Sequence, residues 1–176
     1  FAHTEEFYQF YREKIAIPAI LPNITHIKLA QMQAAGKLSG IVTQNIDGLH
    51  QAAGSWNVYE LHGSIHRNHC LRCKRAYVLA DILGQEGVPR CACGGIIKPD
   101  VVLYGEELDQ KTLSGAIKAI SHADLLIVGG TSLSVYPAAG LLRYFQGRHL
   151  VLINQTATPM DARADLCFSC KLGEIF

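Results

Sequence analysis

Short apolar runs that alternate with helical segments are the feature that most restricts the fold of this 176-residue chain. The runs 124–128 and 150–153 are apolar almost throughout, as strands are when a sheet is buried on both faces. The residue pattern predicts helices over 109–121 and 137–146, next to these runs. This alternation predicts an α/β fold of the doubly wound type, with a parallel sheet and helices on both faces.

Further segments continue the pattern toward both ends of the chain. Thr25 and Gly36 mark the expected start and end of one helix, since threonine is a favoured N-cap and glycine often follows a helix C-terminus. The complete prediction adds helices over 4–15 and 25–35, and strands over 38–43, 57–61, 101–104 and 165–169.

Polar residues gather where several of these strands end. The clusters are residues 44–47, 62–63, 130–132 and 154–155. Ligands of open α/β sheets bind beyond the carboxyl ends of the strands. We therefore expect these clusters to form one binding site.

Composition and charge exclude several classes of protein. With 49% hydrophobic and 18% charged residues, the chain is too apolar for a disordered protein. A formal net charge of +1 argues against direct nucleic-acid binding. No apolar run approaches the ~20 residues that span a bilayer, so we expect no membrane association. No signal peptide opens this sequence, and we expect a cytoplasmic monomer.

Residues 66–98 differ from the rest of the chain because they show little apolar periodicity. They contain two close pairs of cysteines with seventeen residues between the pairs, namely Cys70, Cys73, Cys91 and Cys93. This spacing is close to the two-knuckle pattern in which four thiolates hold one structural zinc ion, with a single-residue spacer in the second pair. Gly94 and Gly95 permit the tight turn that a knuckle needs. The segment is therefore predicted to be an inserted zinc module.

The sequence also offers other interpretations of the cysteines. His69 could replace one cysteine as a ligand, and four unrelated free thiols are a second alternative. Cys167 and Cys170 share the two-residue spacing, but they fall at the predicted strand 165–169, and residues three apart along a strand face opposite ways. We expect a core thiol and a surface or loop thiol there, outside the metal site. A zinc deaminase requires Pro-Cys-x-x-Cys, whereas the second pair here is Cys-x-Cys.

Five motifs follow one another along the chain from residue 43. They are TQNIDGLH at 43–50, ELHGS at 60–64, the four cysteines, KPDVVLYGE at 98–106 and GTSLSVYP at 130–137. In this order they resemble the sirtuins, the NAD-dependent protein-lysine deacylases. The resemblance covers most of the chain from about residue 38. It implies a Rossmann-like NAD-binding domain over 1–65 and 99–176, with the zinc module at 66–98 between these two segments.

The resemblance also implies a reaction. Sirtuins bind NAD at the switch point of the sheet, and an acyl-lysine peptide between the sheet and the zinc module. The amide oxygen of the acyl-lysine attacks C1′ of the nicotinamide ribose, nicotinamide leaves, and the acyl group ends on ADP-ribose. We expect a deacetylase of this type, acting on acyl-lysine proteins or peptides.

Positions within the motifs imply roles for single residues. His62 matches the general base that takes a proton from the ribose hydroxyls, and an imidazole with a pKa of ~6.5 suits that task. Asn45 and Asp47 match the residues that hold the nicotinamide carboxamide. The implied NAD contacts are Gln44, Asn45, Ile46, Asp47, Gly130, Thr131, Ser132, Asn154, Gln155, Thr156 and Leu172. The implied peptide contacts, made as an added strand, are Val102, Leu103, Tyr104, Gly105 and Val135.

The sequence departs from the family at its start. Sirtuins begin with a Gly-Ala-Gly loop on the first strand, but no Gly-x-Gly occurs in these 176 residues. We therefore expect the first βα unit of the NAD-binding domain, with its phosphate-binding loop, to be missing from them. Two other functions stay open: protein mono-ADP-ribosylation, which shares the NAD cleavage step, and a non-catalytic module that presents its zinc knuckle to a partner.

Overall fold

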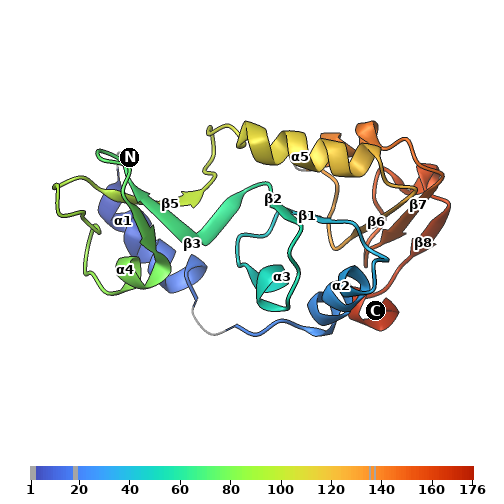
Figure 1. Ribbon diagram of the computed structural model, residues 1–176, viewed down its shortest axis with the longest axis horizontal. Coiled ribbons are helices and arrows are strands. Elements are labelled where there is room, and N and C mark those ends of the chain that lie inside the picture. Colours follow the sequence, from blue (N-terminus) through green and yellow to red (C-terminus); the bar gives the residue numbers. More distant parts are fainter. Residues whose placement is uncertain (1–2, 18–19, 135, 137) are drawn as a thin grey trace. The chain divides into compact units, whose positions relative to one another are not determined.

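The computed structural model of the chain describes residues 3–17, 20–134, 136 and 138–176. The chain divides into two compact units, and Figure 1 traces it from the blue N-terminus to the red C-terminus. Unit 1 consists of Phe1–Leu21, Asn45–Leu49 and His62–Leu108, and unit 2 of Pro22–Gln44, His50–Leu61 and Asp109–Phe176. The segment predicted to be the zinc module, 66–98, lies entirely inside unit 1.

Unit 1 is built on a three-stranded antiparallel sheet. β3 (Gly63–Cys70) is the central strand, between β4 (Ala76–Val78) and β5 (Ile97–Val101). The helical elements of this unit are α1 (Thr4–Phe10), its π-helical continuation η1 (Tyr11–Ile15) and α4 (Leu79–Leu83). The helix predicted over 4–15 is therefore confirmed, with a change of helix type after Phe10.

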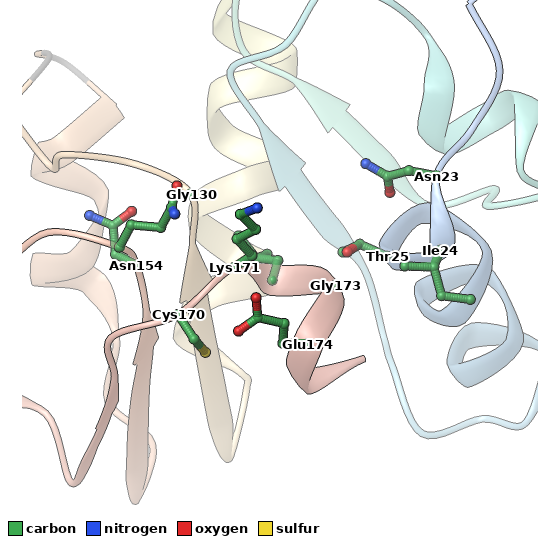
Figure 2. A pocket seen from close by; sticks show the side chains of 11 residues that line it. Asn23, Ile24, Thr25, Gly130, Asn154, Cys170, Lys171, Gly173 and Glu174 are labelled. Atoms are coloured by element: carbon green, nitrogen blue, oxygen red, sulfur yellow. The ribbon is translucent and has the colours of Figure 1, made fainter.

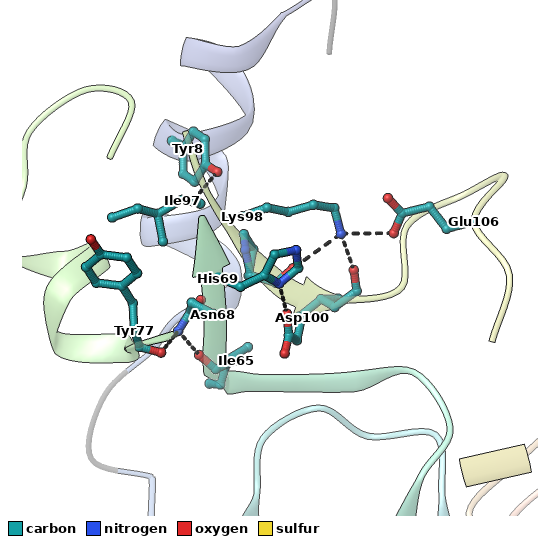
Figure 3. A network of polar contacts seen from close by, with 11 residues as sticks. Tyr8, Ile65, Asn68, His69, Tyr77, Ile97, Lys98, Asp100 and Glu106 are labelled. Carbon is teal, nitrogen blue, oxygen red and sulfur yellow. Dashed lines mark hydrogen bonds and ion pairs between the residues drawn. The ribbon is translucent and has the colours of Figure 1, made fainter. Parts of the chain in front are cut away.

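Aromatic and aliphatic side chains fill the core of unit 1. Tyr8 and Tyr11 are buried together with Ile82 and Ile97. The Tyr8 hydroxyl donates a hydrogen bond to the carbonyl oxygen of Ile97 at 2.6 Å, which ties the first helix to β5 (Figure 3). Burial raises the pKa of Tyr8 to about 12, although the nearby Arg12 guanidinium lowers it.

β5 differs from the strand predicted over 101–104. It ends at Val101 and pairs antiparallel with β3, so it is not part of a parallel sheet, and residues 102–105 lie beyond it. Pro99 has no amide hydrogen and is suited to an edge strand, which is the position of β5. Gly105 has a φ of +86°, which turns the chain soon after the strand ends.

Unit 2 contains the parallel strands. β1 (Ile41–Thr43) pairs with β2 (Val58–Glu60), and a second sheet has the order β6 (Leu125–Gly129), β7 (His149–Ile153), β8 (Leu166–Phe168). Its helices are α2 (Ile24–Ala34), α5 (Gln110–Ser121), η2 (Ala138–Tyr144), η3 (Asp161–Arg163) and α6 (Leu172–Ile175), while α3 (Leu49–Ala52) begins at the border of the units. Parallel strands joined by helices agree with the predicted α/β class. The described residues form two parallel sheets, whereas one was predicted.

Capping residues explain where the helices of unit 2 begin. α2 begins after Asn23, whose side-chain oxygen accepts a hydrogen bond from the His26 amide at 3.2 Å, so the predicted N-cap at Thr25 is wrong. Asp109 caps α5 in the same way, by accepting from the Thr112 amide at 2.8 Å. Gly36, with a φ of +67°, ends α2 as predicted.

The helix predicted over 137–146 is a 3₁₀ helix, η2, over Ala138–Tyr144, and Pro137 lies outside the described residues. Gly140 in its middle weakens an α-helix there. Leu141 and Leu142 on η2 are buried, and Leu142 packs with Leu150 and Leu152 of β7. Within the described ranges, no helix is long and apolar enough to cross a membrane.

Candidate functional site

Four cysteine sulfurs of unit 1 converge on one point. Their Sγ atoms all lie within 4.8 Å of one another, with 3.5 Å between Cys70 and Cys93 and 3.6 Å between Cys73 and Cys91. A tetrahedral zinc ion with Zn–S bonds of about 2.3 Å separates its sulfurs by about 3.8 Å. The four thiols therefore fit a structural zinc ion, and they are the ligands predicted from the spacing.

Backbone geometry holds the two knuckles in place. The Cys73 amide donates to the sulfur of Cys70, and the Cys93 amide to that of Cys91, both at 3.5 Å. A Cβ atom on Gly95 would lie 2.7 Å from the Cys70 sulfur, so a larger residue there would fill the cluster. The glycine expected to permit the turn is needed for this close approach.

Hydrogen bonds within the cluster shift the pKa values of its thiols in opposite directions. The Cys93 amide and the Tyr77 hydroxyl lower the pKa of Cys91 to about 6. The Gly95 amide lowers the pKa of Cys93, but the three neighbouring sulfurs outweigh it and raise the value to about 11. Binding of a zinc ion would therefore displace the protons that remain at neutral pH.

The remaining ligand alternatives are resolved. His69 directs its Nδ1 at the Asp100 carboxylate (Figure 3). Among the described residues, the metal-binding group contains only the four cysteines. Cys167 and Cys170 stay outside it, as predicted. The prediction that one of them is a core thiol is wrong, because Cys167 is exposed on β8 and Cys170 is half-buried in a cavity. All three residues of β8 are exposed, so the strand has no buried face.

The loop after β1 is fastened to the first residues of β3. The Ile46 carbonyl oxygen accepts from the Ile65 amide at 3.0 Å. The Asp47 carbonyl oxygen lies 2.9 Å from Nε2 of His66, and one carboxylate oxygen of Asp47 accepts from the Leu49 amide at 3.0 Å. These contacts fix the backbone of the Asn-Ile-Asp segment beside the strand that follows His62.

His62 lies just before β3, half-buried, in the same unit as this loop. Its carbonyl oxygen accepts from the Val102 amide at 3.0 Å. Gly63 follows with a φ of +77°, and a Cβ atom there would lie 1.7 Å from the Asp100 carbonyl oxygen. The chain passes so close to β5 at this position that only glycine fits.

The predicted peptide-binding residues Val102, Leu103, Tyr104 and Gly105 form a turn after β5. The Glu106 amide donates to the Leu103 carbonyl oxygen at 2.9 Å, which closes the turn. Tyr104 is fully exposed at its corner. Val135, the fifth predicted residue of this set, lies outside the described residues.

A cavity of about 510 Å³ lies in unit 2 and is within the size range of ligand sites. Four of the predicted NAD contacts line it, namely Gly130, Asn154, Gln155 and Leu172. Figure 2 labels Gly130 and Asn154 among them. A Cβ atom on Gly129 would lie 2.6 Å from a Leu172 methyl carbon, so the glycine pair lets α6 approach the end of β6.

Other predicted contacts lie near the same strand ends. Gln44, just after β1, donates to the Thr131 hydroxyl at 3.5 Å, which joins the carboxyl ends of β1 and β6. The hydroxyls of Ser132 and Ser134 are 2.5 Å apart, and the Asn154 side chain donates to the Thr156 carbonyl oxygen at 2.9 Å. The predicted NAD contacts Asn45, Ile46 and Asp47 belong to unit 1, and the remaining ones to unit 2.

The cavity also contains polar residues that were not predicted. They are Asn23 and Thr25 at the start of α2, and Lys171 and Glu174 around α6 (Figure 2). Only the N-cap of α2 had a detectable sequence signal, because a helix N-terminus offers free amide groups. Lys171 and Glu174 belong to no motif, and only folding brings them to the cavity.

Comparison with known proteins gives consistent results. Residues 1–137 match the Sir2 family. The chain is 57% identical over 175 residues to an NAD-dependent protein deacetylase of Clostridium acetobutylicum, covering 98% of the chain and 71% of the relative. It is 58% identical over 172 residues to an NAD-dependent protein deacetylase of Cutibacterium acnes, covering 98% of the chain and 70% of that relative.

Solved structures agree. A Sir2 structure bound to an acetylated peptide has a TM-score of 0.91 and 41% identity, and the match covers 99% of this chain and 76% of that one. A Sir2 complex with a p53 peptide and NAD⁺ has a TM-score of 0.91 and 41% identity, and the match covers 99% of this chain and 75% of that one. These matches confirm the predicted Rossmann-like fold class.

Proposed function

The chain belongs to the Sir2 family and is an NAD-dependent protein deacetylase, and from this premise we propose which of its residues perform the reaction. NAD supplies the nicotinamide leaving group and the ribose that receives the acyl group. Acyl-lysine in a protein or peptide is the second substrate, and one zinc ion on the four cysteines is the structural metal.

The observation that carries the assignment is the position of His62. Its carbonyl oxygen is bonded to Val102, the first of the proposed peptide-binding residues, and the next strand fastens the Asn45–Asp47 loop. The proposed base, the proposed peptide edge and the proposed nicotinamide contacts thus belong to one unit with continuous backbone hydrogen bonds. Such rigid support suits a group that must receive a proton at a fixed place.

His62 is the general base, and it accepts a proton from a ribose hydroxyl through its imidazole nitrogen. Asn45 offers both a donor and an acceptor to the nicotinamide carboxamide, and Asp47 offers acceptors only. One Asp47 oxygen already accepts from the Leu49 amide, so we assign the other to this contact. Together, Asn45 and Asp47 would hold the carboxamide and favour the departure of nicotinamide.

Unit 2 contributes the remaining NAD contacts. Gly130, Asn154, Gln155 and Leu172 line the cavity that receives the adenosine end, and Gln44 and Thr131 bind the ribose and phosphate groups. Thr131 is itself oriented, because its hydroxyl accepts from the Leu133 amide at 3.2 Å. We also assign residues 66–98 as the zinc module. A cytoplasmic location is also part of this proposal, because paired cysteines that hold a metal suit a reducing compartment.

The test is deacetylation of an acetyl-lysine peptide by the intact protein, and the release of nicotinamide is the quantity measured. Release is expected only when NAD and the acetylated peptide are both present. His62→Ala is expected to lower kcat about 10²- to 10⁴-fold, the usual contribution of a general base. His149→Ala, on the exposed first residue of β7, is the matched control. Full activity of His62→Ala would refute the assigned base.

A further inference from the structure

Beside the proposed peptide edge lies a buried lysine that neither the zinc site nor the proposed chemistry uses. We propose that Lys98 and Glu106 are positioning residues that hold residues 102–105 in the conformation to which the acyl-lysine peptide pairs, an inference that rests on the proposed function. Neither residue belongs to the predicted site, although both flank it in the sequence.

Lys98 is enclosed although it carries a charge. Its side chain is 10% exposed, and its ammonium group donates to the carbonyl oxygens of Pro99 and Val101, at 3.3 and 3.1 Å, and to Glu106 Oε2 at 3.0 Å (Figure 3). All three ammonium hydrogens therefore have acceptors. Burying a lysine costs free energy unless it is fully paired, so this arrangement firmly fixes the end of β5.

Glu106 connects this lysine to the turn. The same Oε2 atom accepts from the Leu103 amide at 3.0 Å, while the Glu106 amide donates to the Leu103 carbonyl oxygen. Partial burial would raise the pKa of Glu106, but the Leu103 amide and the Lys98 ammonium outweigh it, and the pKa lies below its ordinary value. The carboxylate is thus ionised at neutral pH, and its Oε2 atom links the Leu103 amide to the Lys98 ammonium group.

The network leaves one set of backbone groups free. Within the described part of the chain, no hydrogen bond engages the Val102 carbonyl group or the amide and carbonyl groups of Tyr104 and Gly105. The Val102 amide is already used by His62. A peptide that adds as a strand binds through such groups, and its affinity rises when they are held in place beforehand. Lys98 and Glu106 supply that preorganisation.

Substitution of Lys98 or Glu106 is therefore expected to weaken peptide binding and to leave NAD binding almost unchanged. We would compare Glu106→Gln and Lys98→Met with two exposed controls, Glu107→Gln and Lys118→Met. Binding of a fluorescent acetyl-lysine peptide is followed by anisotropy without NAD, and KM is measured for both substrates. The peptide Kd and KM are expected to rise about tenfold, as loss of a charge-assisted hydrogen bond implies. The KM for NAD stays within about twofold.

The double variant is expected to bind peptide no more weakly than Lys98→Met alone, because both changes remove one network. If Lys98→Met unfolds, Glu106→Gln decides alone, since its side chain is 41% exposed and tolerates the change. Unchanged peptide affinity in Glu106→Gln, or equal rises in KM for peptide and NAD, would overturn the positioning role. Failure of the proposed function is a different result, since unmodified protein would then release no nicotinamide.

Discussion

The Nε2 atom of His66 lies 2.9 Å from the carbonyl oxygen of Asp47. A carbonyl oxygen only accepts, so this nitrogen carries the hydrogen and donates. The ring also covers Gly48, where a Cβ atom would lie 2.7 Å from Cδ2 of His66. The His66 side chain thus supports the loop that carries Asn45 and Asp47.

Removing this support should weaken catalysis without destroying it. In His66→Ala, the Asp47 backbone loses one neutral hydrogen bond, so kcat/KM for deacetylation should fall about three- to tenfold. Steady-state kinetics on an acetyl-lysine peptide measure the effect. His122→Ala is the control, because that ring bonds only within or beside its own helix. Equal kcat/KM values for His66→Ala and the control would contradict the role given to His66.

The close approach at Gly63 makes a sharper prediction about stability. Gly63→Ala places a methyl group against the Asp100 backbone and requires a φ of +77°, so the free energy of unfolding should fall by more than about 3 kcal/mol. Gly54→Ala requires a similarly unfavourable φ of +102° but meets nothing within 4 Å, so it should cost only about 1–2 kcal/mol. Urea unfolding of both variants gives the comparison, and equal losses would show that the contact with Asp100 does not matter.

The sequence predicted those elements that depend on local pattern. The apolar runs at β6 and β7 and the capped helix α5 lie within one or two residues of their expected positions. The partner of β5 was missed, because the run 101–104 has the same composition whether it joins a parallel sheet or an antiparallel one. The pairing of β5 depends on Pro99 and on contacts with β3, a strand that is far from β5 in the sequence.

The site divides in the same way. Cysteine spacing alone was sufficient for the metal cluster, because each knuckle is a local turn. By contrast, the roles proposed for His62 and Asp47 come from the resemblance of the ordered motifs to the family, since no spacing rule predicts them. The contacts of Lys98 with Glu106, and of His66 with Asp47, join residues eight and nineteen positions apart. Periodicity reports which face is buried and cannot report such pairs.

Tyr8 predicts how stability depends on alkaline pH. Its pKa in the folded protein is raised to about 12 from a value of 10.0, so the unfolded chain ionises first as the pH rises. Stability due to Tyr8 is complete below pH 10 and falls by about 1.4 kcal/mol per pH unit from there until the folded group also ionises. Tyr8→Phe should lack the Tyr8 part of this slope and keep the part due to Tyr11, whose pKa is also raised by burial. Urea unfolding between pH 9 and 11 measures it, and parallel curves for the two proteins would refute the assignment.

Zinc removal should unfold much of unit 1, because the cluster joins the end of β3 to the 91–95 turn. Intact protein is expected to contain one zinc ion per chain by atomic emission. Cys91→Ser should lose it, and its unfolding midpoint should fall by more than about 10 °C, since a structural zinc ion contributes directly to folding. EDTA should have the same effect on unmodified protein, and added zinc should reverse it. Cys167→Ser, at an exposed thiol outside the cluster, should keep both its zinc and its midpoint. Full zinc content in Cys91→Ser would refute the four-cysteine site.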